Sequence, residues 1–184
     1  MGGVTEPSSV SLNAIIRGAD QVSPGQNPPL HLWNPPFCGD IAIEVKADGQ
    51  WFHEGRPMRR QALVNLFASI LRREEDGDYY LVTPVEKCRI QVALHPLMIV
   101  DVDREADDSG LEWLWVTLNT QSRMRIDREH PMHLEPRAAG AGYIDLPYGL
   151  SALCARAAWY RLVELADETG TLRSGDCEFS LHSQ

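Results

Sequence analysis

The sequence predicts an α+β protein of two structurally similar halves, each an antiparallel sheet curled over one helix. Three observations support this prediction. Stretches in which apolar and polar residues alternate are typical of half-buried strands. Two segments with apolar residues at helical spacing indicate one main helix in each half. A weak internal repeat relates residues 41–71 to residues 143–166, since both run from strands through a glycine-marked turn into a helix that begins near an arginine, Arg60 or Arg156.

The repeat divides the chain into three parts. Residues 1–30 form a lead, in which residues 8–18 are compatible with a short helix and the following VSPGQNPPL is too rich in turn residues for regular structure. The first α+β half spans residues 31–95 and the second spans residues 96–184. We expect His95-Pro96 to be the hinge between them.

The first half opens with a hairpin. Its first strand is the alternating segment DIAIEVK, and Asp48-Gly49 follows as the preferred pair for a two-residue turn. A loop of these two residues alone predicts three cross-strand pairs: Val45 with Phe52 on the core side, and Lys46 with Trp51 and Glu44 with His53 on the other face.

A long helix follows this hairpin. Pro57 suits the first helical position because it has no amide hydrogen to leave unpaired. Apolar residues recur at helical spacing from Met58 to Leu71, and Gly77 follows the helix as a breaker. Two strands complete the half, at YYLVT and EKCRIQVAL.

The second half begins with another hairpin, LMIVDVD and LEWLWVTLN, joined by an acidic loop. Residues 111–118 are apolar on both faces, so we place this strand near the contact between the halves. SRMRID, HPMHLEP and CEFSL predict shorter strands. A second helix is predicted over residues 150–166, and its narrow polar arc predicts that it is the more buried of the two helices.

Composition excludes several classes of protein. The chain has 184 residues, 43% of them hydrophobic and 23% charged, which is typical of a globular protein and too apolar for a disordered one. Its net charge of −9 repels phosphate backbones, so we expect no nucleic-acid partner and no membrane partner. The start of the chain lacks a secretory pattern, and the four cysteines form no C-x-x-C pair. A cytoplasmic location is therefore expected.

No cofactor or metal site is predicted. The acids from Asp101 to Glu112 follow the spacing of a calcium loop, but Ala106 stands where that loop needs glycine, so a solvated hairpin loop is the better interpretation. His130 and His133 would point to opposite faces of a strand and could not share a zinc ion. The sequence also has no phosphate-binding glycine pattern and no nucleophile elbow, so no catalytic residue is predicted.

Polar residues inside or beside apolar strands are the candidate ligand-binding residues. One interpretation is that they only form turns and caps. The other is that they line one cleft between the halves, where polar groups over an apolar floor would bind a small zwitterionic or mixed polar ligand. The candidates are Thr83, Glu86, Lys87, Thr117 and Asn119.

Several short motifs occur along both halves of the chain. They are Trp33-x-Pro35, Gly39-Asp40, Asp48-Gly49-x-Trp51, Glu54-Gly55-x-Pro57, Arg60, Leu66-Phe67, Ile70-Leu71, residues 81–86, Thr117-x-Asn119 and His130-Pro131. In these motifs the chain resembles an uncharacterised proteobacterial family, the one called domain of unknown function 1285. The resemblance covers about residues 31–181, and it is more specific in the first half. It implies a two-part α+β protein made of repeated strand-and-helix units, with a suggested role in signal transduction or ligand binding and with no reaction or cofactor.

We therefore expect a non-enzymatic small-ligand-binding protein or signalling adaptor. A hydrolase or transferase with an unrecognised active site is one alternative, and a protein–protein interaction module that presents Trp33, Trp51 and Phe37 is another. The ligand, the partner and the oligomeric state stay open at this point.

Overall fold

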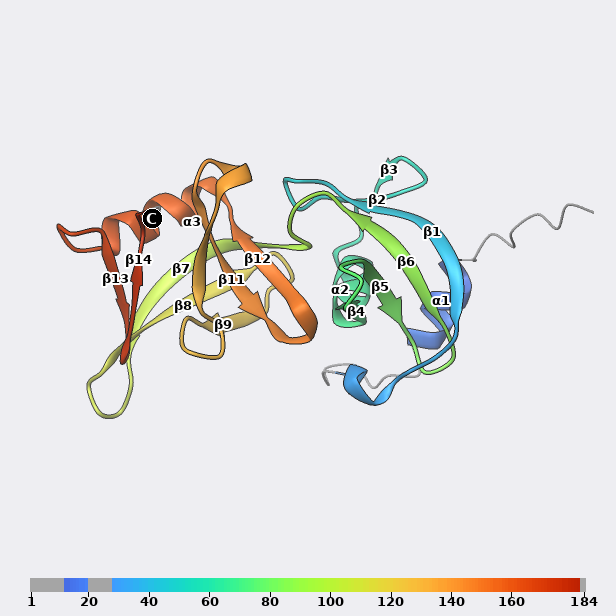
Figure 1. The fold of residues 1–184 in the computed structure, drawn as a ribbon, viewed down its shortest axis with the longest axis horizontal. Helices are drawn as coiled ribbons and strands as arrows, with labels where there is room; N and C mark the ends of the chain where they lie inside the picture. The colour runs from blue at the N-terminus through green and yellow to red at the C-terminus, as the bar shows by residue number, and fades with distance from the viewer. Residues whose placement is uncertain (1–11, 20–27, 183–184) are drawn as a thin grey trace, which may run out of the picture. The chain divides into compact units, whose positions relative to one another are not determined.

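The computed structural model describes residues 12–19 and 28–182, and the chain divides between Ala93 and Leu94 into two compact units. Figure 1 shows the elements of both units along the chain. The first unit contains α1 (Leu12–Ala19), a short 3-10 turn (Leu30–Leu32), β1 (Phe37–Val45), β2 (Trp51–His53), β3 (Arg56–Pro57), α2 (Gln61–Ser69), β4 (Leu71–Arg73), β5 (Tyr79–Val82) and β6 (Lys87–Val92). The second contains β7 (Leu97–Ala106), β8 (Glu112–Leu118), β9 (Arg123–Arg125), β10 (Met132–Glu135), a 3-10 turn (Pro136–Ala138), β11 (Ala141–Leu146), a second 3-10 turn (Pro147–Gly149), β12 (Leu150–Cys154), α3 (Arg156–Leu165), β13 (Thr171–Ser174) and β14 (Cys177–Ser180).

The first unit is a six-stranded sheet in the order β3-β2-β1-β6-β5-β4. In Figure 1 its long strands β1 and β6 curve around α2. Phe67 of α2 and Leu71 and Leu81 of the sheet are fully buried, and the ring of Trp51 stacks on Phe67 with the ring centroids 6.5 Å apart. This curvature encloses the apolar core that the alternating residues of β1 predict.

The second unit is a six-stranded sheet in the order β10-β11-β12-β7-β8-β9. Helix α3 packs on β7, β11 and β12, and the β13–β14 hairpin packs beside β8 (Figure 1). Ala158 and Leu162 are the buried residues of α3, and Ile99 and Ile144 are fully buried on the sheet beneath.

The two sheets have the same topology. In each unit three strands run outward from the centre, the chain returns to the opposite edge, and three more strands run inward. The first and sixth strands of each unit then pair in parallel at the centre of the sheet, β1 with β6 and β7 with β12. The other neighbouring strands pair antiparallel. The predicted two similar halves are confirmed, but the sheets are mixed, not antiparallel as predicted.

The predicted equivalence of the helices is wrong. Helix α2 connects the third strand of its sheet to the fourth, whereas α3 follows the sixth strand of the other sheet. The equivalent of α2 in the second unit is the connection from Arg125 to Met132, which contains no helix. The match of Arg60 to Arg156 therefore aligned the starts of two helices that are not equivalent. The two units resemble each other in the order of their strands.

The predicted register of the first hairpin is wrong by one residue. Val45 lies opposite Trp51, and Glu44 lies opposite Phe52. The loop is longer than two residues because Gly49 donates its amide to the Lys46 carbonyl at 2.9 Å, and Lys46 donates to the Gln50 carbonyl at 2.9 Å. Gly49 then adopts a φ of 78°, the left-handed bulge position of a three-residue loop. Trp51 consequently lies in the core with 3% of its surface exposed.

The first long helix does not begin at Pro57 as predicted. Glu54 and Gly55 form a tight turn with positive φ values of 49° and 73°, which pairs Phe52 with Pro57 and makes β3 an edge strand. Proline is tolerated there because an edge strand can leave one side unpaired. Helix α2 begins four residues later, at Gln61.

The second predicted helix is too long. Residues 150–154 form β12 instead, which lies between β11 and β7 and is buried at all five positions. A short apolar run fits a central strand as well as a helix, so periodicity alone could not separate them. Helix α3 is also not the more buried helix, because Tyr160 and Val163 are 53% and 45% exposed.

Strand β8 is buried on one face and half-covered on the other. Leu114, Val116 and Leu118 point into the core. On the opposite face the turn at Gly175 packs on the ring of Trp113, and the guanidinium of Arg125 lies 4.1 Å from the centre of that ring. Cation–π stacking therefore covers part of this second apolar face, which the sequence analysis had placed near a contact between the halves.

Among the described residues no helix is long and apolar enough to cross a membrane.

Gly49→Val is expected to lower the free energy of unfolding by about 1–3 kcal/mol, because a β-branched residue is strained at positive φ. The measurement is chemical denaturation of the whole chain. Ala47→Val, in the same loop but without a positive φ, is the control and should change stability little. Equal losses in the two variants would contradict the loop geometry.

Gly142→Ala is expected to lower the free energy of unfolding by about 1–3 kcal/mol through overpacking. A Cβ at this position would lie 2.8 Å from Cζ3 of Trp159 on α3 and 3.4 Å from Sδ of Met132. The measurement is a double-mutant cycle with Trp159→Ala, in which the cost of Gly142→Ala should largely disappear. Additive losses would show that α3 does not pack on β11 at this position.

Candidate functional site

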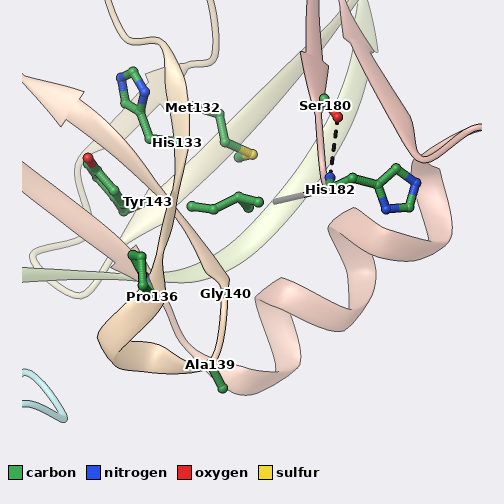
Figure 2. Close-up of a pocket in the computed structure, with 9 residues that line it drawn as sticks. Met132, His133, Pro136, Ala139, Gly140, Tyr143, Ser180 and His182 are labelled. Atoms are coloured by element: carbon green, nitrogen blue, oxygen red, sulfur yellow. Dashed lines mark hydrogen bonds between the residues drawn. The ribbon is translucent and has the colours of Figure 1, made fainter. Parts of the chain in front are cut away.

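The candidate site is a pocket of about 760 Å³ in the second unit (Figure 2). It extends around the edge strand β10 and reaches the end of β14. Figure 2 shows His133 and Tyr143 on one side of β10, and Met132, Ser180 and His182 on the other. The lining residues are Met132, His133, Leu134, Pro136, Ala139, Gly140, Tyr143, Ser180 and His182.

Strand register places the imidazole of His133 beside the phenol of Tyr143. The two residues are direct partners in the antiparallel β10–β11 pair, so their side chains share a face. Their ring centroids are 5.2 Å apart. The connection between the strands needs positive φ at Ala139 and Gly140, with values of 54° and 77°, and this tight turn forms one end of the pocket.

A second imidazole packs against Tyr143. The ring centroid of His95 lies 4.7 Å from that of Tyr143, so the phenol contacts one histidine ring on the neighbouring strand and another from the segment before β7. Burial, followed by the nearby carboxylates of Asp145 and Glu135, raises the pKa of Tyr143. The hydroxyl therefore stays protonated, and it has no hydrogen-bond partner within the described part of the chain.

The two histidines that line the pocket are held by different contacts. His133 Nε2 lies 2.9 Å from a carboxylate oxygen of Asp145, the residue two positions beyond Tyr143 on β11. His182 Nε2 lies 3.0 Å from the Thr169 carbonyl and donates to it, which leaves Nδ1 of His182 without a partner among the described residues. The backbone amide of His182 donates to Ser180 Oγ at 3.3 Å. A ligand in the pocket could therefore meet a phenol, a hydroxyl and a ring nitrogen.

Behind Tyr143 lies a buried polar network of three side chains. His95 Nδ1 is 2.7 Å from Ser151 Oγ, and His95 Nε2 is 3.1 Å from Glu135 Oε2. Arg137 donates its backbone amide to Glu135 Oε1 at 2.9 Å and its guanidinium Nε to the same oxygen at 3.2 Å. Three segments distant in the sequence, the residues before β7, the end of β10 and the start of β12, thus meet at one imidazole.

The protonation states of this network follow from its contacts. The hydrogen bonds from the Arg137 side chain and backbone lower the pKa of Glu135 from 4.5 to about 2. Burial, the largest effect, lowers the pKa of His95 although Glu135 opposes it, so the imidazole is neutral near pH 7. An ionised carboxylate only accepts hydrogen bonds, so His95 carries its proton on Nε2, and its Nδ1 accepts the hydroxyl proton of Ser151.

Three of the five predicted ligand-binding residues lie in the first unit, at the turn from β5 to β6. Thr83 is fully buried, and its hydroxyl donates to the Glu86 carbonyl at 3.1 Å and accepts from the Glu86 amide at 3.2 Å. A Cβ on Gly18 would lie 3.0 Å from the Thr83 side chain, so α1 covers this residue closely. Lys87 Nζ pairs with Glu74 at 2.6 Å and lies 5.1 Å from the ring centre of Tyr80.

The other two predicted residues lie in the second unit at the end of β8. Asn119 Oδ1 accepts a hydrogen bond from the backbone amide of Met98 at 3.1 Å, and the backbone amide of Asn119 donates to the Met98 carbonyl at 2.8 Å. Thr117 pairs with Asp101 and Arg123 in the sheet. Thr83 closes the turn from β5 to β6, and Asn119 extends the pairing of β8 with β7 through its two hydrogen bonds to Met98. The prediction that all five residues line one cleft stays a prediction.

Sequence reasoning missed the residues that form the pocket and the network. His95 was interpreted as part of a hinge and Ser151 was assigned to a helix. Residues 143–146 were expected to be a strand of the repeat, but Tyr143 was not considered as a site residue. His133 was considered only as a zinc ligand. The alternation of apolar and polar residues in YIDL places Tyr143 and Asp145 on one face, next to the tight turn at Gly140, and this signal for the phenol was not used.

Other features considered in the sequence have structural partners. The acidic segment forms the β7–β8 hairpin, where Asp107 accepts from the amides of Ser109 and Leu111 and from the indole of Trp113. His130 lies 3.2 Å from Asp127, so it and His133 have separate carboxylate partners. Across residues 12–19 and 28–182 no three His, Cys, Asp or Glu side chains cluster as metal ligands. Trp51 is buried, so the expectation that it is presented to a protein partner is wrong.

Comparisons with known proteins agree with the fold. The model of the DUF1285 N-terminal domain, a domain of unknown function, matches residues 28–93, and that of the DUF1285 C-terminal domain matches residues 96–183. The crystal structure of a DUF1285 family protein from Silicibacter pomeroyi DSS-3 is 37% identical with a TM-score of 0.79, and the match covers 90% of this chain and 93% of that one. A DUF1285 family protein from Shewanella baltica OS155 is 31% identical with a TM-score of 0.56, over 69% of this chain and 94% of that one. The comparison with curated proteins gives no match. The chain therefore belongs to the DUF1285 family, and each of its two units corresponds to one domain of that family.

Proposed function

We propose that this protein binds a small ligand in the pocket beside Tyr143. The observation that carries the proposal is the phenol itself, which is half-buried at the pocket wall, packed against two imidazole rings and without a hydrogen-bond partner in the described residues. A fixed donor at the wall of a concave site is what recognition of a small molecule requires.

The lining residues indicate the chemistry of the ligand. Met132, Leu134 and Pro136 offer apolar surface, and Tyr143, Ser180 and His182 offer polar atoms. No lysine or arginine is among the described residues that line the pocket, so a polyphosphate would lack the cations that usually hold it. The pocket therefore suits a compact molecule with an apolar body and one or two hydrogen-bond acceptors.

The two histidines that pack against Tyr143 reduce the entropic cost of binding a ligand. A side chain that is already fixed loses little rotamer freedom when a ligand arrives. Asp145 orients His133 and the network of Glu135 and Ser151 orients His95, so both rings that contact the phenol are themselves held. Preorganisation of this kind favours binding as the role of the pocket.

Benzamide, which has an apolar ring and a carbonyl acceptor, is a suitable probe. Chemical-shift mapping by NMR is expected to show perturbed amides along residues 132–143, and Tyr143→Phe is expected to weaken benzamide about 2–12-fold, the value of one hydrogen bond. Tyr160→Phe, a tyrosine on the outer face of α3, is the control and should leave the affinity unchanged. Perturbations confined to other parts of the chain, or equal effects of the two variants, would contradict the proposal.

The stability of the second unit is expected to fall at acid pH through Glu135. Its pKa is lowered from 4.5 to about 2, so its contribution is present above pH 4.5 and is lost as the pH falls toward 2. His95 acts in the same direction at higher pH because burial lowers its pKa below 6.5. Denaturant titrations between pH 7 and pH 2 should show a shallower loss below pH 4.5 for Glu135→Gln than for the wild type. An identical pH profile would show that Glu135 is not ionised by these contacts.

A further inference from the structure

The contact between Ser151, His95 and Glu135 has the order of a nucleophile, a base and an orienting carboxylate. A serine hydroxyl lies 2.7 Å from one imidazole nitrogen, and a carboxylate lies 3.1 Å from the other. Both distances are within the range that proton transfer and orientation require. Arrangements of this type are recognised by geometry and not by sequence spacing, since they occur in several chain orders.

We propose that Ser151 is a reactive nucleophile that accepts an acyl group from a carboxylic ester, with His95 as its general base and Glu135 as the residue that positions His95. The proposal goes beyond ligand binding in the pocket and does not depend on it.

The direction of the hydrogen bonds supports this assignment. Glu135 is ionised and accepts from Nε2 of His95, so the lone pair of the neutral imidazole is on Nδ1 and faces the Ser151 hydroxyl. Arg137 holds Glu135 through two donors to Oε1 and leaves Oε2 facing His95, although its guanidinium also approaches Oε2 at 3.4 Å. The base is therefore in the tautomer that can take the serine proton.

Burial of the three residues is compatible with reactivity. Ser151 is 9% exposed, His95 5% and Glu135 8%. A nucleophile needs only its oxygen to be reachable, and exclusion of water strengthens the electrostatic interactions around it. None of the three residues lines the pocket, but the ring of His95 packs on Tyr143, which does. One side chain therefore connects the network to a cavity large enough for a small ester.

The reaction with an ester balances without a further oxidant or reductant. Ser151 Oγ forms a bond to the carbonyl carbon while its proton moves to His95 Nδ1. The bond between the carbonyl carbon and the alcohol oxygen then breaks, and the leaving oxygen takes the proton from Nδ1. Water, deprotonated by the same nitrogen, attacks the acyl-serine and releases the carboxylic acid and the free Ser151 hydroxyl.

A fluorophosphonate probe tests the proposal directly. Attack by Ser151 Oγ forms an O–P bond, breaks the P–F bond, releases fluoride and leaves a stable adduct that mass spectrometry of the intact chain and of its peptides can locate. The folded wild-type protein is expected to gain one adduct, on Ser151, and protein unfolded by denaturant none. His95→Gln is expected to slow labelling at least about 100-fold, the usual contribution of a general base. Glu135→Gln should also slow it, because the carboxylate no longer fixes the tautomer.

Ser109→Ala is the matched control, because the Ser109 hydroxyl donates to a carboxylate oxygen of Asp107 and has no hydrogen bond to a histidine of residues 12–19 and 28–182. This variant should label as the wild type does. Absence of an adduct on the folded wild type, an adduct on another residue, or an unchanged rate in Glu135→Gln would overturn the proposal and assign the three residues a structural role. If His95→Gln does not fold, as judged by circular dichroism, the wild-type peptide map and the Glu135→Gln rate decide the matter. Binding of benzamide beside Tyr143 is measured separately, so either proposal can fail alone.

Discussion

Both units depend on one interaction, the parallel pairing of their first and last strands at the centre of the sheet. β1 pairs with β6, and β7 pairs with β12. Each of these strands has a neighbour on both sides, so their backbone groups are satisfied within the sheet. The outer strands attach to this pair by short antiparallel connections, which fixes their register from the centre outward. The side chains that form the core and the pocket are thereby assigned to their faces.

The strand order of the second unit brings together the residues of the candidate site. Ser151 is the second residue of β12. Parallel pairing of β12 with β7 brings it beside His95, in the segment before β7. Antiparallel pairing carries the same alignment to β11 and then to β10, where His133 meets Tyr143. Tyr143 consequently contacts two histidines that are 38 positions apart in the sequence. A change of one residue in the register of β11 would turn the phenol to the opposite face of the sheet.

The sequence predicted the local elements better than their pairing. The alternating pattern of β1, the β7–β8 hairpin and the two similar halves were predicted and all are present, although the internal repeat had aligned two helices that are not equivalent. Parallel pairing between distant strands leaves no local pattern, so the mixed sheets were predicted as antiparallel. The segment LSALC was assigned to a helix because five apolar or small residues fit either a central strand or a buried turn of helix. His95, Glu135 and Ser151 are far apart in the sequence, and only the strand order brings them together.

The same strand order has a consequence for biosynthesis. A sheet whose central pair consists of its first and last strands cannot form that pair until the last strand has been made. Most of its stabilising contacts therefore form late, between residues that are far apart in the sequence. For the first unit this moment comes when Val92 has left the ribosome, before β7, the first strand of the second sheet, has emerged. The outward strands β1–β3 must wait with one side of β1 unpaired, and the arrival of β6 covers that side. Because each set of six strands is continuous in the chain, the first unit can complete its sheet while the second is still being translated, and the two identical topologies do not compete for the same strands.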